Sequence, residues 1–222
     1  MRKEEILTLA RSQIGVREDP IGSNRVKYNT EYYGMEVRGR QYPWCCVFQW
    51  WLFHALGGDG LFYGGGKTAS CTVLYRFYEK RGQGVKPAEI RPGDLVFFVF
   101  DGGKSGGVNH VGLCEEAGPG YVVTIDGNTG DDEANGGTVA RKRRSLRYVA
   151  GGARPEYEED GMRLYRYVAE MPQWARAAAE KAVKMGYIKM DETGAAGVWE
   201  SNLQTLVWLD RAGLLDKAAR EV

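Results

Sequence analysis

The sequence predicts an α+β protein, with helices in the first half of a main domain and an antiparallel sheet in the second half. Apolar residues recur at helical spacing before residue 81, whereas short apolar runs separated by glycine turns follow residue 92. Helices first and strands afterwards are typical of an α+β domain. A composition of 43% apolar, 27% charged and 12% aromatic residues is that of a folded globular protein.

The N-terminal half predicts three helices separated by loops. An amphipathic helix is expected from about residue 4, ending before Gly15. The segment 43–56 is apolar nearly all round, starts with proline and precedes two glycines, which predicts a buried helix. A polar, tyrosine-rich loop is expected over 17–42, and a third helix over about 70–81.

The sheet is expected from Asp94 onward. Residues 94–100 are apolar on both faces, as in a central strand. Further strands are expected over residues 110–114, 121–126, 139–144 and 147–150. The basic run 141–144 is interpreted as a solvated edge strand, because charges on an edge limit aggregation.

The sequence predicts three parts: a main domain over 1–155, a charged linker over 156–171 and a helical hairpin over 172–222. The hairpin is too small for a secure core of its own, so we expect it to dock or to self-associate.

The charge and the cysteine content of the chain argue against several classes of protein. Thirty basic residues against 29 acidic ones leave a net charge of +1, which argues against nucleic-acid binding. No apolar run reaches the ~18 residues of a membrane span, so no membrane insertion is expected. Since the charged N-terminus lacks a signal-peptide core, we expect cytoplasmic synthesis. Two histidines and four cysteines lack zinc-site spacing, so no metal or cofactor is expected.

A cysteine at the start of the buried helix is the strongest local signal of chemistry. The helix dipole and free N–H groups favour the thiolate and so activate a nucleophile. Cys45 and Cys46 both lie there, but adjacent helical residues point ~100° apart, so one of them faces a given site. The alternative is that both are small buried apolar residues.

His110 is the candidate base for this cysteine. His54 lies nine residues after Cys45 on the same helix, too far along the axis to reach the sulfur. His110 begins a strand, and the next strand ends in Asp126 and Asn128, either of which could orient the imidazole. The alternative interpretation of residues 126–128 is a simple turn.

Five ordered motifs, over about residues 4–150, together resemble the CHAP family of cysteine, histidine-dependent amidohydrolases/peptidases. They are an N-terminal segment (13–24), Pro-Trp-Cys (43–45), Pro-Gly-Asp-Leu-Val-Phe-Phe (92–98), Asn-His-Val-Gly (109–112) and Thr-Ile-Asp-Gly-Asn-Thr (124–129). The N-terminal motif is similar to that of phage endolysins in this family.

The resemblance implies a papain-like scaffold with Cys45 as nucleophile and His110 as general base. Asp126 stands where the family commonly has glutamate, so Asn128 is an alternative orienting residue. Residues 31–44 contain few acidic residues, so no calcium site is expected. Similarity to the endolysin motif implies substrate contacts by Glu18, Asn24 and Tyr28. The alternative is that they belong to an ordinary loop.

The implied function is that of an endolysin, a hydrolase of bacterial peptidoglycan that forms an acyl-enzyme on a cysteine. Such an enzyme acts on the wall after release and, if encoded by a phage, uses a holin-type export partner. The hairpin would then bind cell wall, mediate self-association or cap the domain. Two alternatives remain at this stage: a bacterial autolysin, and a catalytically silent wall-binding protein on the same scaffold.

Overall fold

The computed structural model describes residues 1–100, 102, 106–130, 137–158 and 164–217. The chain divides into two compact units, Met1–Tyr157 and Glu158–Val222. Each unit has its own buried apolar cluster.

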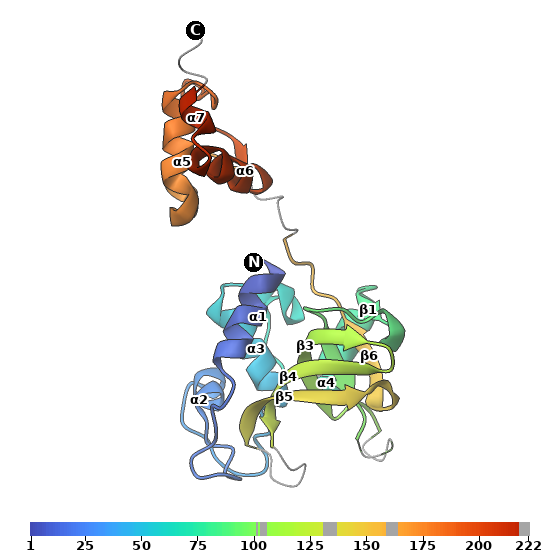
Figure 1. The fold of residues 1–222 in the computed structure, drawn as a ribbon. Helices are drawn as coiled ribbons and strands as arrows, with labels where there is room; N and C mark the ends of the chain where they lie inside the picture. Colours follow the sequence, from blue (N-terminus) through green and yellow to red (C-terminus); the bar gives the residue numbers. More distant parts are fainter. Residues whose placement is uncertain (101, 103–105, 131–136, 159–163, 218–222) are drawn as a thin grey trace. The chain divides into compact units, whose positions relative to one another are not determined.

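The first unit combines helices with an antiparallel six-stranded sheet (Figure 1). Its helices are α1 (Lys3–Ser12), α2 (Lys27–Tyr33), α3 (Cys45–Ala55) and α4 (Cys71–Lys80), with 3-10 turns at Asp59–Leu61, Tyr63–Gly65, Pro87–Glu89 and Leu146–Tyr148. Its strands are β1 (Gly84–Val85), β2 (Leu95–Phe98), β3 (His110–Gly118), β4 (Tyr121–Thr129), β5 (Thr138–Ser145) and β6 (Val149–Ala153). The sheet order is β1-β6-β2-β3-β4-β5. The predicted α+β class is therefore confirmed.

The central strand has the predicted character. All four residues of β2 are buried, because Leu95 and Phe97 face the helices while Val96 and Phe98 join a second apolar cluster on the other face. The strand expected over 147–150 begins later, because Leu146–Tyr148 form a 3-10 turn. Residues 149–153 form β6, which pairs with both β1 and β2 and so lies inside the sheet.

The expected loop over 17–42 is partly wrong, because it contains the helix α2. Tyr28 and Asn29 of this helix are buried, and Gly34 ends it in the left-handed conformation, with φ of +72°. Since α2 packs on α3, tertiary burial stabilises a segment whose seven residues would not form a helix alone.

Helix α3 forms the centre of the first unit, as its apolar sequence predicts. It packs against β3 and β4 (Figure 1). The contact with β4 requires a glycine, because a Cβ atom on Gly127 would lie 2.5 Å from Cβ of Phe48 and 2.7 Å from the Trp44 ring. This close packing brings the start of α3 to the end of β4.

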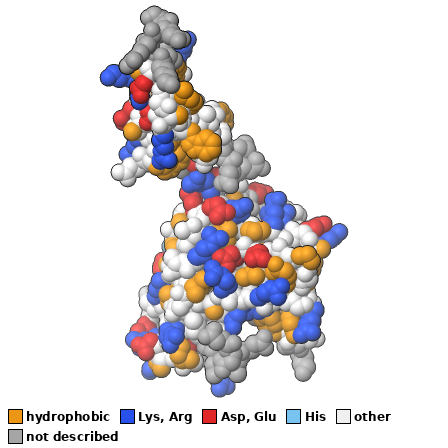
Figure 2. Space-filling view, in the orientation of Figure 1, with side chains coloured by type: hydrophobic (Ala, Val, Ile, Leu, Met, Phe, Trp, Pro, Cys, Tyr) orange, Lys and Arg blue, Asp and Glu red, His pale blue; other side chains and the backbone are white. Residues whose placement is uncertain are grey.

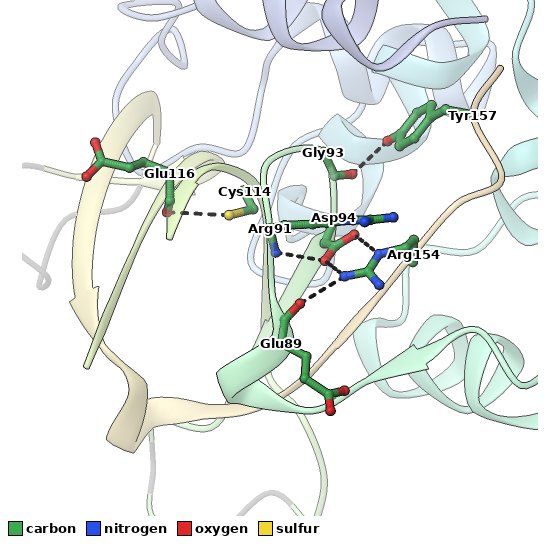
Figure 3. Close-up of polar contacts among 8 residues, drawn as sticks. All are labelled: Glu89, Arg91, Gly93, Asp94, Cys114, Glu116, Arg154 and Tyr157. Atoms are coloured by element: carbon green, nitrogen blue, oxygen red, sulfur yellow. Dashed lines mark hydrogen bonds and ion pairs between the residues drawn. The ribbon is translucent and has the colours of Figure 1, made fainter. Parts of the chain in front are cut away.

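A buried carboxylate ties the end of the first unit to the start of β2 (Figure 3). Asp94 is 1% exposed and accepts hydrogen bonds from the backbone N–H of Arg91 and from Nε and a terminal nitrogen of Arg154, at 2.8–2.9 Å. The hydroxyl of Tyr157 donates to the carbonyl of Gly93. Asp94 thus links segments 60 residues apart.

The second unit contains more than the expected hairpin. Its elements are β7 (Leu164–Tyr165), a 3-10 turn (Val168–Glu170), α5 (Gln173–Lys184), β8 (Val198–Trp199), α6 (Glu200–Arg211) and α7 (Leu214–Lys217). β7 pairs antiparallel with β8. Tyr165 and Met171, within the segment 156–171 for which we expected a linker, are buried in this unit's core. That segment is therefore not a linker throughout, because it supplies a strand and core side chains.

Surface charge is mixed in sign. In the view of Figure 2, Lys and Arg side chains are interspersed with Asp and Glu across the first unit. Among the described residues, no helix has the length and apolar character needed to cross a bilayer.

Candidate active site

Cys45 is the first residue of α3 and is 6% exposed. The preceding residue, Trp44, is fully buried, and its indole Nε1–H donates to Oε1 of Glu18 at 2.7 Å. This bond fixes the chain just before the cysteine. The position at a helix start is the one that the sequence predicts for a nucleophile.

His110 begins β3 and lies against Asp126 of β4. Their side chains join at 2.8 Å between Nε2 and Oδ2, and Asp126 is fully buried. Asp126 can approach because Gly112 has no side chain: a Cβ atom there would lie 2.0 Å from Oδ1 of Asp126. The Gly of the His-Val-Gly motif therefore makes room for the carboxylate.

The structure distinguishes Asp126 from Asn128. β4 has a register irregularity after Asp126, and Asn128 within it adopts φ of +53°. The Asn128 side chain makes no hydrogen bond with the described residues, whereas Asp126 contacts His110 directly.

The His110–Asp126 pair carries shifted pKa values. Burial lowers the pKa of His110, but the hydrogen bond and charge of Asp126, with a further contribution from Cys45, outweigh it and raise the pKa to about 9. Burial alone would raise the pKa of Asp126, but His110 and the nearby Arg144 guanidinium outweigh that and hold it below the usual value. Both shifts favour an ion pair.

The Cys45 thiol has an unexpected neighbour. Its sulfur lies 3.6 Å from that of Cys71, the first residue of α4. This contact and burial raise the pKa of Cys45 well above its usual value, whereas His110 acts in the opposite direction. In the resting protein the thiol form therefore outweighs the thiolate that the helix start predicts.

The other cysteines are also free and buried. Cys46 is fully buried and its thiol donates to the carbonyl of Thr68. Cys46 therefore packs inside the core, while Cys45 is the one that interacts with His110. His54 lies at the other end of α3, where it bonds to Asp59 at 2.7 Å.

The three residues expected to contact substrate make contacts within the protein. Tyr28 is fully buried, and its ring packs among Trp44, Phe48 and Trp51. Glu18 is 2% exposed and binds the Trp44 indole. Asn24 has φ of +57° and donates to the carbonyl of Gly39, which holds two loops together.

Sequence reasoning missed Cys71, Gly112 and Arg144 as members of this site. Gly112 belongs to a motif that the sequence analysis identified. The need for glycine there comes from the Asp126 carboxylate, which the pairing of β3 with β4 brings next to it. Cys71 and Arg144 come from distant segments, and no local pattern marks them. A helix-start cysteine, a strand histidine and a buried carboxylate together have the parts of a cysteine- and histidine-dependent hydrolase.

Comparison with known proteins agrees with this arrangement. Residues 37–128 match the family model of the CHAP domain, and this span contains Cys45, His110 and Asp126. Over these residues the chain is therefore similar to the CHAP domain family.

Solved structures provide a second comparison. The chain is similar to the crystal structure of a wild-type endolysin, LysIME-EF1, with a TM-score of 0.43 and 16% identity over 75% of this chain and 70% of that one. It is also similar to Ly7917 with the hydrolysing product of MDP, with a TM-score of 0.44 and 18% identity over 74% of this chain and 65% of that one. Curated protein sequences yield no match.

Proposed function

We propose that this protein is a peptidoglycan hydrolase of the endolysin type, which cleaves an amide bond in the peptide part of the bacterial cell wall. The observation that carries the proposal is the hydrogen bond of His110 with the buried Asp126, next to Cys45 at a helix start, within a span that matches the CHAP domain. The motifs that resemble phage endolysins support this substrate over other amides. A silent wall-binding protein would have no need to keep a buried ion pair next to a cysteine.

The proposed mechanism is acyl transfer through Cys45. Because Nε2 of His110 is engaged by Asp126, Nδ1 is the ring atom left to take the proton of the thiol. The neutral ring makes this transfer, and the raised pKa of His110 makes that form a stronger base, which offsets the raised pKa of Cys45. The thiolate sulfur then attacks the amide carbon, and the backbone N–H of Cys45 at the helix start can stabilise the oxyanion.

His110 completes the reaction in two steps. As imidazolium it donates its proton to the leaving amine, so that the C–N bond breaks and the acyl group stays on the Cys45 sulfur. The neutral ring then takes a proton from water, which attacks the thioester and releases the free acid. Asp126 stabilises the imidazolium and holds the ring. We assign this role to Asp126, since it contacts the ring, and not to Asn128.

Mass spectrometry of muropeptides released from purified walls tests the proposal. The wild type should release fragments, and Cys45→Ala should release none. Cys46→Ala is the matched control, because this neighbour packs in the core, and it should retain hydrolysis. Free lactyl groups with intact stems would identify an amidase, and new N-termini within stem or bridge an endopeptidase. A wild type that releases nothing from several wall types, or an active Cys45→Ala, would refute the assignment.

For the second unit we propose wall binding, with self-association as the alternative. Three of its tryptophans are exposed, at 50% for Trp174, 45% for Trp199 and 73% for Trp208, and exposed aromatic side chains often serve in recognition. Full-length Cys45→Ala protein should sediment with purified walls, and adding Trp208→Ala should weaken this. Unchanged sedimentation, with a change in oligomeric state, would favour self-association.

A further inference from the structure

Arg144 differs from its neighbours on β5 because its side chain turns into the protein. Side chains alternate along a strand, and Arg141 and Arg143 are exposed, whereas the side chain of Arg144 is only 11% exposed. β5 is the last strand in the sheet order, as an edge strand must be. The interpretation of the whole basic run as solvated is nevertheless wrong for Arg144, which has a buried partner.

That partner is the carboxylate that contacts the candidate base. A terminal nitrogen of Arg144 forms an ion pair with Oδ2 of Asp126 at 2.5 Å and also donates to the hydroxyl of Thr124 at 3.1 Å. Oδ2 is the same oxygen that meets Nε2 of His110. The other oxygen, Oδ1, has no hydrogen-bond partner among the described residues. His110 and Arg144 therefore both hold Oδ2 of the carboxylate, and the Thr124 side chain contributes a further hydrogen bond to Asp126.

Two aromatic rings hold the guanidinium in place. It lies 4.9 Å from the ring centre of Phe98 and 5.1 Å from that of Phe100, which is a favourable cation–π geometry. The same two rings contact the His110 ring, at 6.0 and 5.6 Å between centres. Arg144 is thus packed in one cluster with the base and its carboxylate.

We propose that Arg144 is a positioning residue of the active site, whose guanidinium holds the ionised Asp126 carboxylate against His110 and limits the basicity of the imidazole. The inference rests on the proposed function, since it assigns Arg144 a role in the chemistry of that same site. Arg144 acts through Asp126, and a fully buried carboxylate needs a cationic partner to stay ionised.

The sign of the effect follows from the charges around His110. Among the described residues, these are Asp126 from β4, the Cys45 thiol from α3 and, through Asp126, Arg144 from β5. Asp126 favours the imidazolium, while the positive charge of Arg144 beyond it disfavours a second positive charge. Removing the charge of Arg144 should therefore raise the pKa of His110, with Asp126 remaining ionised beside the imidazolium.

An NMR titration of the histidine ring protons measures this without substrate. We would compare Arg144→Gln with Arg143→Gln, both in the Cys45→Ala protein, where no hydrolysis interferes. Arg144→Gln should shift the pKa of His110 upward by about one unit or more, as expected for one nearby charge. Arg143→Gln, which alters an exposed side chain of the same strand, should leave it unchanged. An unchanged or lowered pKa in Arg144→Gln overturns the inference.

Arg144→Lys provides the second variant, because lysine restores the positive charge. It therefore tests the electrostatic role even if Arg144→Gln disrupts the packing of the cluster. It should return the pKa of His110 toward the wild-type value, and failure to do so contradicts the electrostatic role. In the active protein, the acidic limb of the pH–rate profile, where the neutral ring of His110 becomes available as a base, should move to higher pH in Arg144→Gln but not in Arg143→Gln. If wild-type protein releases no muropeptides, the proposed function fails, while the titration still decides the role of Arg144.

Discussion

Replacing Asp126 with asparagine should remove most of the pH dependence that His110 gives to folding stability. Asparagine keeps the shape of the side chain but not its charge. In the wild type, burial lowers the pKa of His110, but Asp126, with a smaller contribution from Cys45, outweighs burial and raises the pKa to about 9. A raised histidine pKa stabilises the fold fully below the unfolded value of about 6.5, and this stabilisation is lost as the pH rises through about 9.

The magnitude follows from the size of the shift. A rise from about 6.5 to about 9 corresponds to about 3 kcal/mol in the free energy of unfolding at low pH. Roughly 2 kcal/mol of this should be lost between about pH 6 and about pH 8.5. The variant also leaves the Arg144 guanidinium without its anionic partner, which lowers the stability of the variant at both pH values and so cancels in the comparison.

Urea unfolding of both proteins at the two pH values measures the effect. The wild type should lose about 2 kcal/mol more than Asp126→Asn between about pH 6 and about pH 8.5. An equal loss in the two proteins would refute the reasoning. NMR titration gives an independent check, since the chain has two histidines and His54→Gln assigns them. A His110 resonance that titrates below 6.5 in the wild type would refute it as well.

Three further predictions follow from single contacts. Gly112→Ala should displace the Asp126 carboxylate, reduce muropeptide release by about 100-fold and cost about 1–3 kcal/mol of unfolding free energy in urea. Cys71→Ala should lower the pKa of Cys45, because the neighbouring thiol raises it; the pH dependence of iodoacetamide alkylation of the Cys45 peptide, followed by mass spectrometry, measures this. Arg154→Ala should cost about 1–3 kcal/mol in urea unfolding, because it removes a partner of the buried carboxylate in Figure 3.

Each of these variants has a matched control. Gly60→Ala places a methyl group in open space, and Cys114→Ala removes a buried thiol that belongs to the other apolar cluster. Arg76→Ala removes an exposed arginine from α4. If a control changes the measured quantity as much as its partner variant does, the contact invoked for that variant is not the cause.

Much of the helical and strand structure was predictable because it depends on local periodicity. The buried helix that begins at Cys45 is apolar all round, with proline before it and glycines after it, and the structure has α3 over Cys45–Ala55. The central strand was predictable for the same reason. By contrast, α2 is too short to form on sequence preference alone, and its burial on α3 decides it.

The candidate site was likewise predictable only in part. Cys45 and His110 were identifiable because each begins an element, where a side chain can face a site. The choice between Asp126 and Asn128 was not predictable, because it depends on which side chain the irregularity in β4 leaves facing His110. The burial of Tyr28 was not predictable, because a motif position does not reveal that its ring packs against Trp44.

The sequence by itself determined the α+β class, the buried helix and the cysteine and histidine at the starts of their elements, because periodicity, helix ends and turns are local properties. Only the tertiary structure decided that Arg144 faces Asp126 and that Cys71 contacts Cys45. Each pair joins residues of two different elements, the strands β4 and β5 for the first and the helices α3 and α4 for the second. Their electrostatic effects depend on burial and on distances of a few ångströms. Strand pairing and helix packing set these distances, and the spacing of residues along the chain does not encode them.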